Sequence, residues 1–157
     1  MAAGSQHAVV LTDSGLVWAW GSNSYGQIGD GTSTTRAVPT VVPTISGVTA
    51  IAAGGNSTYA LKTDGTVWAW GQNTYGQLGD GTGYSRTAPV AVTGLSNVIA
   101  IAAGNVHALA LKSDGTVWAC YRGGVPDGQC TWTPRRLSEF HAALEAAEEE
   151  EKVLGHG

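Results

Sequence analysis

This chain of 157 residues is short of charge, of cysteine and of long apolar runs. Charged residues make up 13% of it, and the formal net charge of -4 gives no electrostatic reason to expect binding to nucleic acid or to an acidic membrane surface. No apolar run approaches the roughly 20 residues that span a bilayer. We therefore expect neither nucleic acid nor a membrane as a partner.

Cysteine occurs only at Cys120 and Cys130. Zinc usually takes four ligands, and the CxxC pairs typical of zinc sites are missing. The two cysteines fit a local disulfide in an oxidising compartment, or two buried thiols. The compartment stays open between secreted bacterial and cytoplasmic. No signal peptide is visible, but Met1 falls in the middle of an expected strand, so we expect a truncated N-terminus.

Phenylalanine and methionine occur once each, whereas glycine occurs 23 times and tryptophan 6 times. Low charge together with many Gly, Thr, Ala and Val residues favours short strands joined by tight turns over helices. The sequence therefore predicts an all-β fold.

The sequence repeats with a period of fifty residues and no gap. VWAWGSNSYGQIGDGT at 17–32 returns as VWAWGQNTYGQLGDGT at 67–82, and a third copy begins as VWAC at 117. Strands are predicted at 48–54 and 98–104, on both sides of each Asp-Gly or Ser-Gly turn, and around Pro39 and Pro89. Asp64-Gly65 is typical of a two-residue hairpin turn in which both residues take positive φ. Three to four strands per unit of this length are typical of propeller blades, and the periodicity alone leaves a solenoid open as the alternative.

Two features of each unit suggest how blades would pack. The Ala-Ala-Gly run suits a crowded inner strand. Trp18 and Trp20 are two apart and so lie on one face of a strand, where their rings could fill the gap between blades.

The pattern of Ala-Ala-Gly, Asp-Gly-Thr-Val-Trp-Ala-Trp-Gly and Tyr-Gly-Gln-Leu-Gly-Asp-Gly-Thr resembles the repeat of the regulator of chromosome condensation (RCC1) family over residues 1–119. This resemblance implies RCC1-like β-propeller blades, seven to a ring in the family. We predict an all-β, incomplete β-propeller of RCC1-like four-stranded blades with a C-terminal α-helix. The blades would occupy 1–134, the third copy being degenerate from Cys120, and an acidic helical tail would occupy 135–157.

The predicted tail helix starts at Thr133 and Pro134. Leu137, Phe140 and Leu144 recur at helical spacing and would dock the helix on an exposed blade face. The traces of the repeat after Cys120 weakly resemble the compact blades of bacterial β-lactamase-inhibitory propellers.

Catalytic and metal chemistry find little support in the sequence. His7 and His107 share a register, but Ser57 separates them, so a structural hydrogen bond is favoured. Asp30 and Asp80 stand alone where a calcium loop needs several oxygen ligands. Arg36 and Arg86 are expected to pin a loop to the neighbouring blade, through Asp30 or Asp80. We expect no enzyme and no cofactor.

The sequence therefore predicts a non-enzymatic protein-binding or scaffold module that completes a propeller by self-association, as a homo-oligomer. The alternatives are a secreted inhibitor of an enzyme such as a β-lactamase, and a purely structural self-assembling fragment. The partners expected are other proteins or copies of the chain. Loops after each Ala-Ala-Gly and each Trp-Gly supply the candidate protein-binding residues: Gln6, His7, Asn23, Tyr25, Asn56, Thr58, Asn73, Tyr75, Asn105 and Val106.

Overall fold

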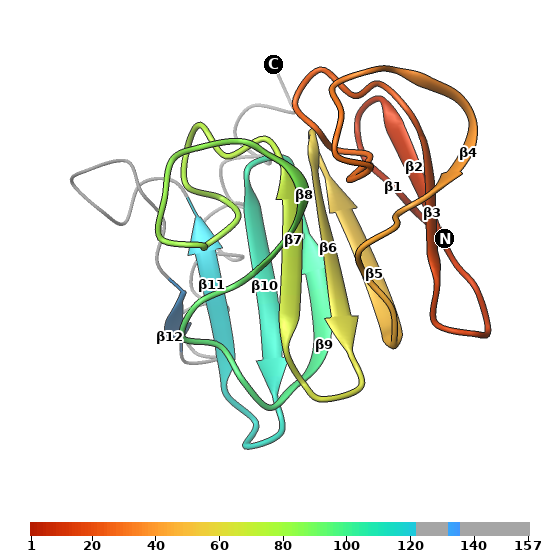
Figure 1. Cartoon of the computed structure of the whole chain (residues 1–157). Coiled ribbons are helices and arrows are strands. Elements are labelled where there is room, and N and C mark those ends of the chain that lie inside the picture. Colours follow the sequence, from red (N-terminus) through yellow and green to blue (C-terminus); the bar gives the residue numbers. More distant parts are fainter. Residues whose placement is uncertain (122–131, 136–157) are drawn as a thin grey trace, which may run out of the picture.

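The computed structural model of the chain describes residues 1–121 and 132–135. Within them the chain forms three four-stranded antiparallel sheets, which stand side by side in chain order (Figure 1). The strands are β1 (Ala2–Ala3), β2 (His7–Leu11), β3 (Val17–Gly21), β4 (Arg36–Val41), β5 (Val48–Gly54), β6 (Ser57–Lys62), β7 (Val67–Gly71), β8 (Arg86–Ala91), β9 (Val98–Ala103), β10 (His107–Lys112), β11 (Val117–Tyr121) and β12 (Thr133–Arg135). No helix in the described part of the chain is long and apolar enough to cross a membrane.

Each sheet is one propeller blade of the predicted kind. The strand orders are β1-β2-β3-β4, β5-β6-β7-β8 and β9-β10-β11-β12, so every blade is a meander. The predicted fourth strand is confirmed as β4 and β8, whose pairing with β3 and β7 is interrupted by an irregular register. Pro39 and Pro89 lie inside these outermost strands, where a missing N–H is tolerated.

The inner strands β1, β5 and β9 converge, as the Ala-Ala-Gly runs predict. The Ser5 N–H donates to the Gly55 carbonyl at 2.8 Å, which joins the inner turns of the first two blades. A Cβ atom on Gly54 would collide with the backbone of Gly104, so only glycine fits at this approach.

The hairpin turns differ from the prediction of a two-residue loop. The Gly65 N–H donates to the Lys62 carbonyl, and the Lys62 N–H to the Thr66 carbonyl, so the loop has three residues. Gly65 has a φ of 80°, whereas Asp64 keeps a negative φ. The Asp64 carboxylate accepts hydrogen bonds from both the N–H and the hydroxyl of Thr66, and these bonds stabilise the turn. A turn closed in this way needs only one left-handed residue.

The core lies between the blades. In the first cluster Val9, Val17 and Ala19 of the first blade pack against Ala60 and Trp70 of the second. In the other cluster the corresponding face of the second blade packs against the third, through Tyr59, Leu61, Val67, Ala69, Ala108, Ala110 and Cys120. Because the same pair of faces meets twice, each blade has one face for the preceding blade and one for the following blade.

The third blade ends in a strand where the sequence predicted the start of a helix. Thr133–Arg135 pairs antiparallel with β11, with Pro134 opposite Trp118. A blade needs a fourth strand to complete its sheet, and this pairing outweighs the local preference of Thr-Pro for a helix start. The predicted helical tail, with Leu137, Phe140 and Leu144, lies outside the described residues.

Candidate protein-binding rim

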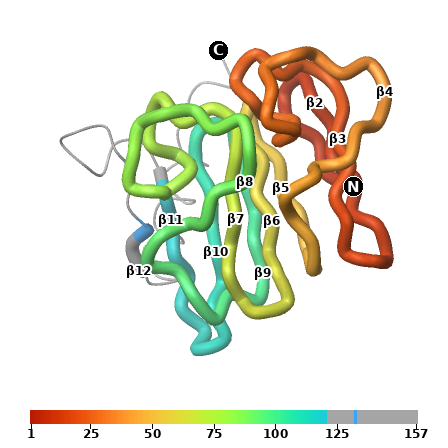
Figure 2. The backbone as a smooth tube through the Cα atoms, in the orientation of Figure 1, coloured from red at the N-terminus to blue at the C-terminus, as the bar shows by residue number. Residues whose placement is uncertain are grey.

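The long loops of the first two blades gather at one end of the molecule, and the short hairpin turns lie at the other (Figure 2). At the first end the Ser22 N–H donates to the Gln6 carbonyl at 2.8 Å, and the Gln72 N–H to the Asn56 carbonyl at 3.0 Å. These bonds hold the loop after the third strand of a blade against its inner turn. We call this end the rim, made of residues 4–6, 22–35, 55–56, 72–85 and 104–106.

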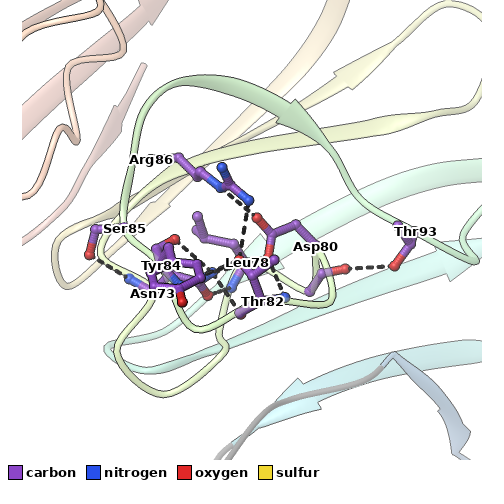
Figure 3. A network of polar contacts seen from close by, with 9 residues as sticks. Asn73, Leu78, Asp80, Thr82, Tyr84, Ser85, Arg86 and Thr93 are labelled. Carbon is purple, nitrogen blue, oxygen red and sulfur yellow. Dashed lines mark hydrogen bonds and ion pairs between the residues drawn. The ribbon is translucent and has the colours of Figure 1, made fainter.

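The longest rim loop of each blade folds around a buried asparagine. The side-chain amide of Asn73 donates to the carbonyls of Thr82 and Tyr84, both at 3.0 Å, and to Asp80 Oδ1 at 3.1 Å (Figure 3). Its carbonyl oxygen accepts from the Leu78 N–H at 3.0 Å. Asn23 repeats these contacts in the first blade. A single side chain therefore fixes the path of the whole loop, which is why both copies carry it.

An aspartate and an arginine close the same loop. Arg86 Nε lies 2.8 Å from Asp80 Oδ2, and Arg36 Nε lies 2.6 Å from Asp30 Oδ2. The predicted pairing is confirmed, but each pair joins the loop to the fourth strand of its own blade, not to the neighbouring blade. The loop doubles back to its own sheet before the chain crosses over, so the arginine that follows it is the nearest cation.

Burial raises the pKa of the Asp80 carboxyl, but hydrogen bonds from Thr82, Arg86 and Asn73 outweigh it and hold that pKa below its ordinary value of 3.8. Asp30 behaves alike, with its pKa lowered against the effect of burial by Thr32 and Arg36. The two rim carboxylates are thus ionised and fully engaged within the fold. Among the described residues no three His, Cys, Asp or Glu side chains gather as a metal site would require.

The rim loop of the first blade also makes hydrogen bonds to the second blade. The Gln27 carbonyl accepts from Trp70 Nε1 at 3.0 Å and from the Thr58 hydroxyl at 2.8 Å. The Trp70 ring is fully buried and lies against Gly29, where a Cβ would come within 2.6 Å of Nε1. The Gly31 N–H donates to the Thr87 carbonyl of β8 at 2.8 Å. Trp70, at the register of Trp20, therefore fills the gap between the first two blades in the way predicted for Trp18 and Trp20.

The third blade has no tryptophan at the register of Trp20 and Trp70, and an indole from another part of the chain takes its place. Cys120 stands in the register of Trp70, and its Sγ lies 3.5 Å from the Gly76 carbonyl. Cys120 is disulfide-bonded, and Cys130 lies outside the described residues. Trp132 is buried, and its indole lies against Gly79 as that of Trp70 lies against Gly29. The indole that is lost in register at Cys120 is thus supplied by a residue twelve positions later.

His7 makes a structural hydrogen bond between blades. Its Nε2 lies 2.9 Å from the Thr58 hydroxyl oxygen. Since that hydroxyl gives its proton to the Gln27 carbonyl, His7 Nε2 must be the donor and Nδ1 carries no proton. Nδ1 is buried without a hydrogen-bond partner among the described residues. Burial lowers the pKa of His7 to about 4, so the ring is neutral near pH 7.

The structure divides the predicted protein-binding residues into two groups. His7, Asn23, Thr58 and Asn73 are buried and serve the fold, so their side chains offer no surface to a partner. Gln6 and Asn105 are exposed, and Asn56, Tyr75 and Val106 are half-buried. Tyr25 is 37% exposed. Those six lie on the rim, and their role in binding stays a prediction.

Tyr84 was missed by the sequence reasoning. It is 75% exposed and lies on the rim loop of the second blade. Thr34 stands at the same register in the first copy, so Tyr84 is not part of the shared pattern. A large aromatic residue inside a polar loop, without a counterpart in the other copy, was the signal that could have revealed it.

The RCC1 repeat profile, described as "Regulator of chromosome condensation (RCC1) repeat", matches residues 14–61 and 64–111. A second profile with the same description matches residues 48–77. Over 47 residues, 30% of this chain, the sequence is 47% identical to the E3 ubiquitin-protein ligase HERC2 of Homo sapiens and equally to that of Mus musculus. Those residues span 1% of either relative.

Solved structures share the fold. Human WBSCR16 matches with a TM-score of 0.72 and 25% identity, over 84% of this chain and 36% of that one. Yeast RCC1 (Prp20), solved with Kap60 bound to it, matches with a TM-score of 0.68 and 26% identity, over 84% of this chain and 36% of that one. The chain therefore spans about a third of the length of these neighbours.

Proposed function

Because the chain belongs to the RCC1 repeat family, we propose that it is a non-enzymatic protein-binding module whose rim is its binding surface. The observation that carries this proposal is the shared orientation of the rim loops, which present Tyr25, Tyr84 and Asn105 at one end of the molecule. Exposed tyrosines suit a protein interface because they combine a large contact area with a polar tip.

Two further observations support a binding role over catalysis. The rim carboxylates Asp30 and Asp80 are committed to ion pairs and loop hydrogen bonds, so they are not available as acid–base groups. Yeast RCC1 (Prp20), which shares the fold, was solved in complex with Kap60. The rim of the present chain is likewise proposed to bind a protein partner.

The test is a pull-down with the intact chain and with a variant that carries Tyr25→Ser and Tyr84→Ser, followed by mass spectrometry. The proteins that bind the rim are expected to be retained by the intact chain and lost with the variant. Leu16→Ser is the matched control, because Leu16 is 38% exposed at the opposite, hairpin end. Equal retention by all three chains would refute the rim as the binding surface.

Self-association is the second candidate. Trp18, on the face of the first blade that would meet a preceding blade, is 38% exposed. Light scattering separates the alternatives, because a homo-oligomer has a mass that is a multiple of 16.0 kDa. If the folded protein has the mass of one chain, 16.0 kDa, even at high concentration, self-association is contradicted and the rim proposal is unaffected.

A further inference from the structure

The inner turn of the first blade, residues 4–6, lies directly against the imidazole ring of His7. A Cβ atom added to Gly4 would collide with the ring carbon Cε1 and would come within 2.5 Å of Nδ1. Glycine at this position therefore lets the turn approach the ring closely. Because Nδ1 is buried without a hydrogen-bond partner among the described residues, the turn separates this nitrogen from water.

Two backbone hydrogen bonds hold the inner turn in place. The Ser5 N–H donates to the Gly55 carbonyl of the second blade, and the Ser22 N–H of the rim loop donates to the Gln6 carbonyl, both at 2.8 Å. Ser5 and Gln6 are exposed, so the turn places no apolar side chain in the core. A surface turn held in this way opens at a much smaller cost than a whole blade.

A proton added to the ring of His7 has to enter at Nδ1. Nε2 already donates to the Thr58 hydroxyl, and protonation leaves that bond in place. The new N–H would be buried against the inner turn. The Gly55 carbonyl, which lies against the same Gly4, already accepts from the Ser5 N–H. Opening of the turn exposes Nδ1 to water, where the charged ring is solvated.

From this geometry we infer that His7 is a proton-sensitive switch of the rim: protonation at Nδ1 releases the inner turn from the Gly55 carbonyl and from the Ser22 N–H. The inference rests on the proposed function of the rim and assigns a regulation to it. Because the inner turn and Ser22 both belong to the rim, its surface changes while the blades stay folded. Acidification then weakens the binding of a partner to the rim.

Charged side chains of the neighbouring elements are not bonded to this ring. The inner turns 4–6 and 55–56 and the adjacent strand β3 contain no ionisable side chain. The ionisable groups on the other elements packed around the ring are Tyr59 and Lys62 of β6, and Asp30 of the rim loop with its ion-pair partner Arg36. The Tyr59 hydroxyl donates to the Gln77 carbonyl, and Lys62 lies over the Trp68 ring. Burial lowers the pKa of His7, so access to water at Nδ1 controls its protonation.

The second blade has the same turn without the ionisable ring. Ser57 stands at the register of His7, and its hydroxyl donates to the Gln72 carbonyl at 2.9 Å. The Gln72 N–H donates to the Asn56 carbonyl at 3.0 Å, as the Ser22 N–H donates to the Gln6 carbonyl in the first blade. One molecule therefore contains the same rim contact with and without a histidine.

The test is hydrogen exchange of the natural chain, followed by NMR from pH 7.5 to pH 5 and corrected for the pH dependence of intrinsic exchange. The amides of Ser5 and Ser22 report on the inner turn, and the amide of Gln72 is the matched control. With a pKa of 6.5 in the open turn and about 4 in the closed turn, the opening constants of Ser5 and Ser22 should rise about 30-fold. The opening constant of Gln72 should stay nearly constant. In His7→Gln, whose side chain does not titrate, the rise should disappear.

An equal rise at Ser22 and Gln72 would show that acid opens the whole chain and would overturn the inference. An unchanged opening constant at Ser22 would overturn it as well. The comparison of these two amides is made within the natural chain, so it decides the matter even if His7→Gln does not fold.

The effect on binding is measured by repeating the pull-down at pH 5. Proteins that bind the rim at pH 7.5 should be retained less at pH 5 by the natural chain, and equally at both pH values by His7→Gln. Equal retention by the natural chain at both pH values would overturn the regulation and leave the rim proposal standing. Capture of no protein at either pH would refute the rim proposal and, with it, the regulation.

Discussion

Acidification is expected to destabilise the protein through His7 before the rim carboxylates Asp30 and Asp80 are protonated. Burial depresses the pKa of this histidine from 6.5 to about 4. The unfolded chain therefore binds a proton at a pH where the folded chain does not. The contribution of neutral His7 to stability is complete above pH 6.5 and is lost as the pH falls from there towards 4.

The magnitude follows from the two pKa values. With 6.5 for the unfolded state and about 4 for the folded state, linkage gives a loss of about 2 kcal/mol between pH 7.5 and pH 5, and about 3 kcal/mol at pH 4. The pKa is low because a proton added at Nδ1 would be buried. Nδ1 has no hydrogen-bond partner among the described residues. The carboxylates Asp30 and Asp80 have pKa values below 3.8, so their protonation destabilises the fold only at lower pH.

The assay is urea unfolding, followed by tryptophan fluorescence, at pH values from 7.5 to 4.5. The natural chain should lose about 2 kcal/mol of unfolding free energy between pH 7.5 and pH 5. The His7→Gln variant should be less stable than the natural chain at pH 7.5, but its unfolding free energy should hardly change between pH 7.5 and pH 5. His107→Gln is the matched control, because His107 occupies the same register but is exposed, and the acid-dependent loss should persist in it. A natural chain whose stability is flat from pH 7.5 to 5 would refute the reasoning about His7.

Three further substitutions test the contacts between and within blades. Gln27 Nε2 lies 3.4 Å from Asn56 Oδ1, whereas Val106 takes the place of that asparagine and Gln77 Nε2 is buried without a partner among the described residues. Val106→Asn should therefore raise the unfolding free energy in urea by about 1 kcal/mol; an unchanged value would show that Gln77 is satisfied in another way. Asn73→Ala removes the side-chain hydrogen bonds that hold the rim loop and should cost about 3 kcal/mol in the same assay, while the neighbouring exposed Thr74→Ala costs less than about 0.5 kcal/mol. Trp132→Ala should cost about 3 kcal/mol and lower the thermal midpoint; a loss as small as that of Thr74→Ala would mean that Trp132 does not seal the gap above Gly79.

Much of the fold could be predicted because the same pattern of strands and turns occurs in two successive copies of the repeat. The position of every strand in the first two blades, the converging Ala-Ala-Gly runs and the burial of Trp70 between blades follow from a gapless period and an alternating pattern. The exchange of Cys120 for Trp132 could not be predicted, because the replacement is close in space and twelve positions away in sequence. The three-residue hairpin was missed because Asp-Gly is compatible with both two-residue and three-residue hairpin loops.

The candidate site was harder to predict than the fold. Asn23 and Asn73, which recur in both copies, are buried and hold the rim loop through the hydrogen bonds of their side chains. The sequence reasoning placed them among the candidate protein-binding residues because they lie in the loops that follow each Trp-Gly. The most exposed aromatic residue of the rim, Tyr84, is the one that breaks the pattern. Tyr25 recurs as Tyr75 and is still partly exposed, so recurrence alone does not separate packing residues from surface residues in this repeat.

The rim loop of the first blade is hydrogen-bonded to the second blade. The segment that opens cooperatively therefore does not coincide with one sequence repeat. Gly31 belongs to the first repeat, but its amide is held by Thr87 in β8. Local opening of the second sheet would therefore release the amide of Gly31 to hydrogen exchange, while the strands of the first sheet stayed protected. A dissection of this chain into single blades, cut wherever one sheet ends, would leave each piece without the loop that closes it.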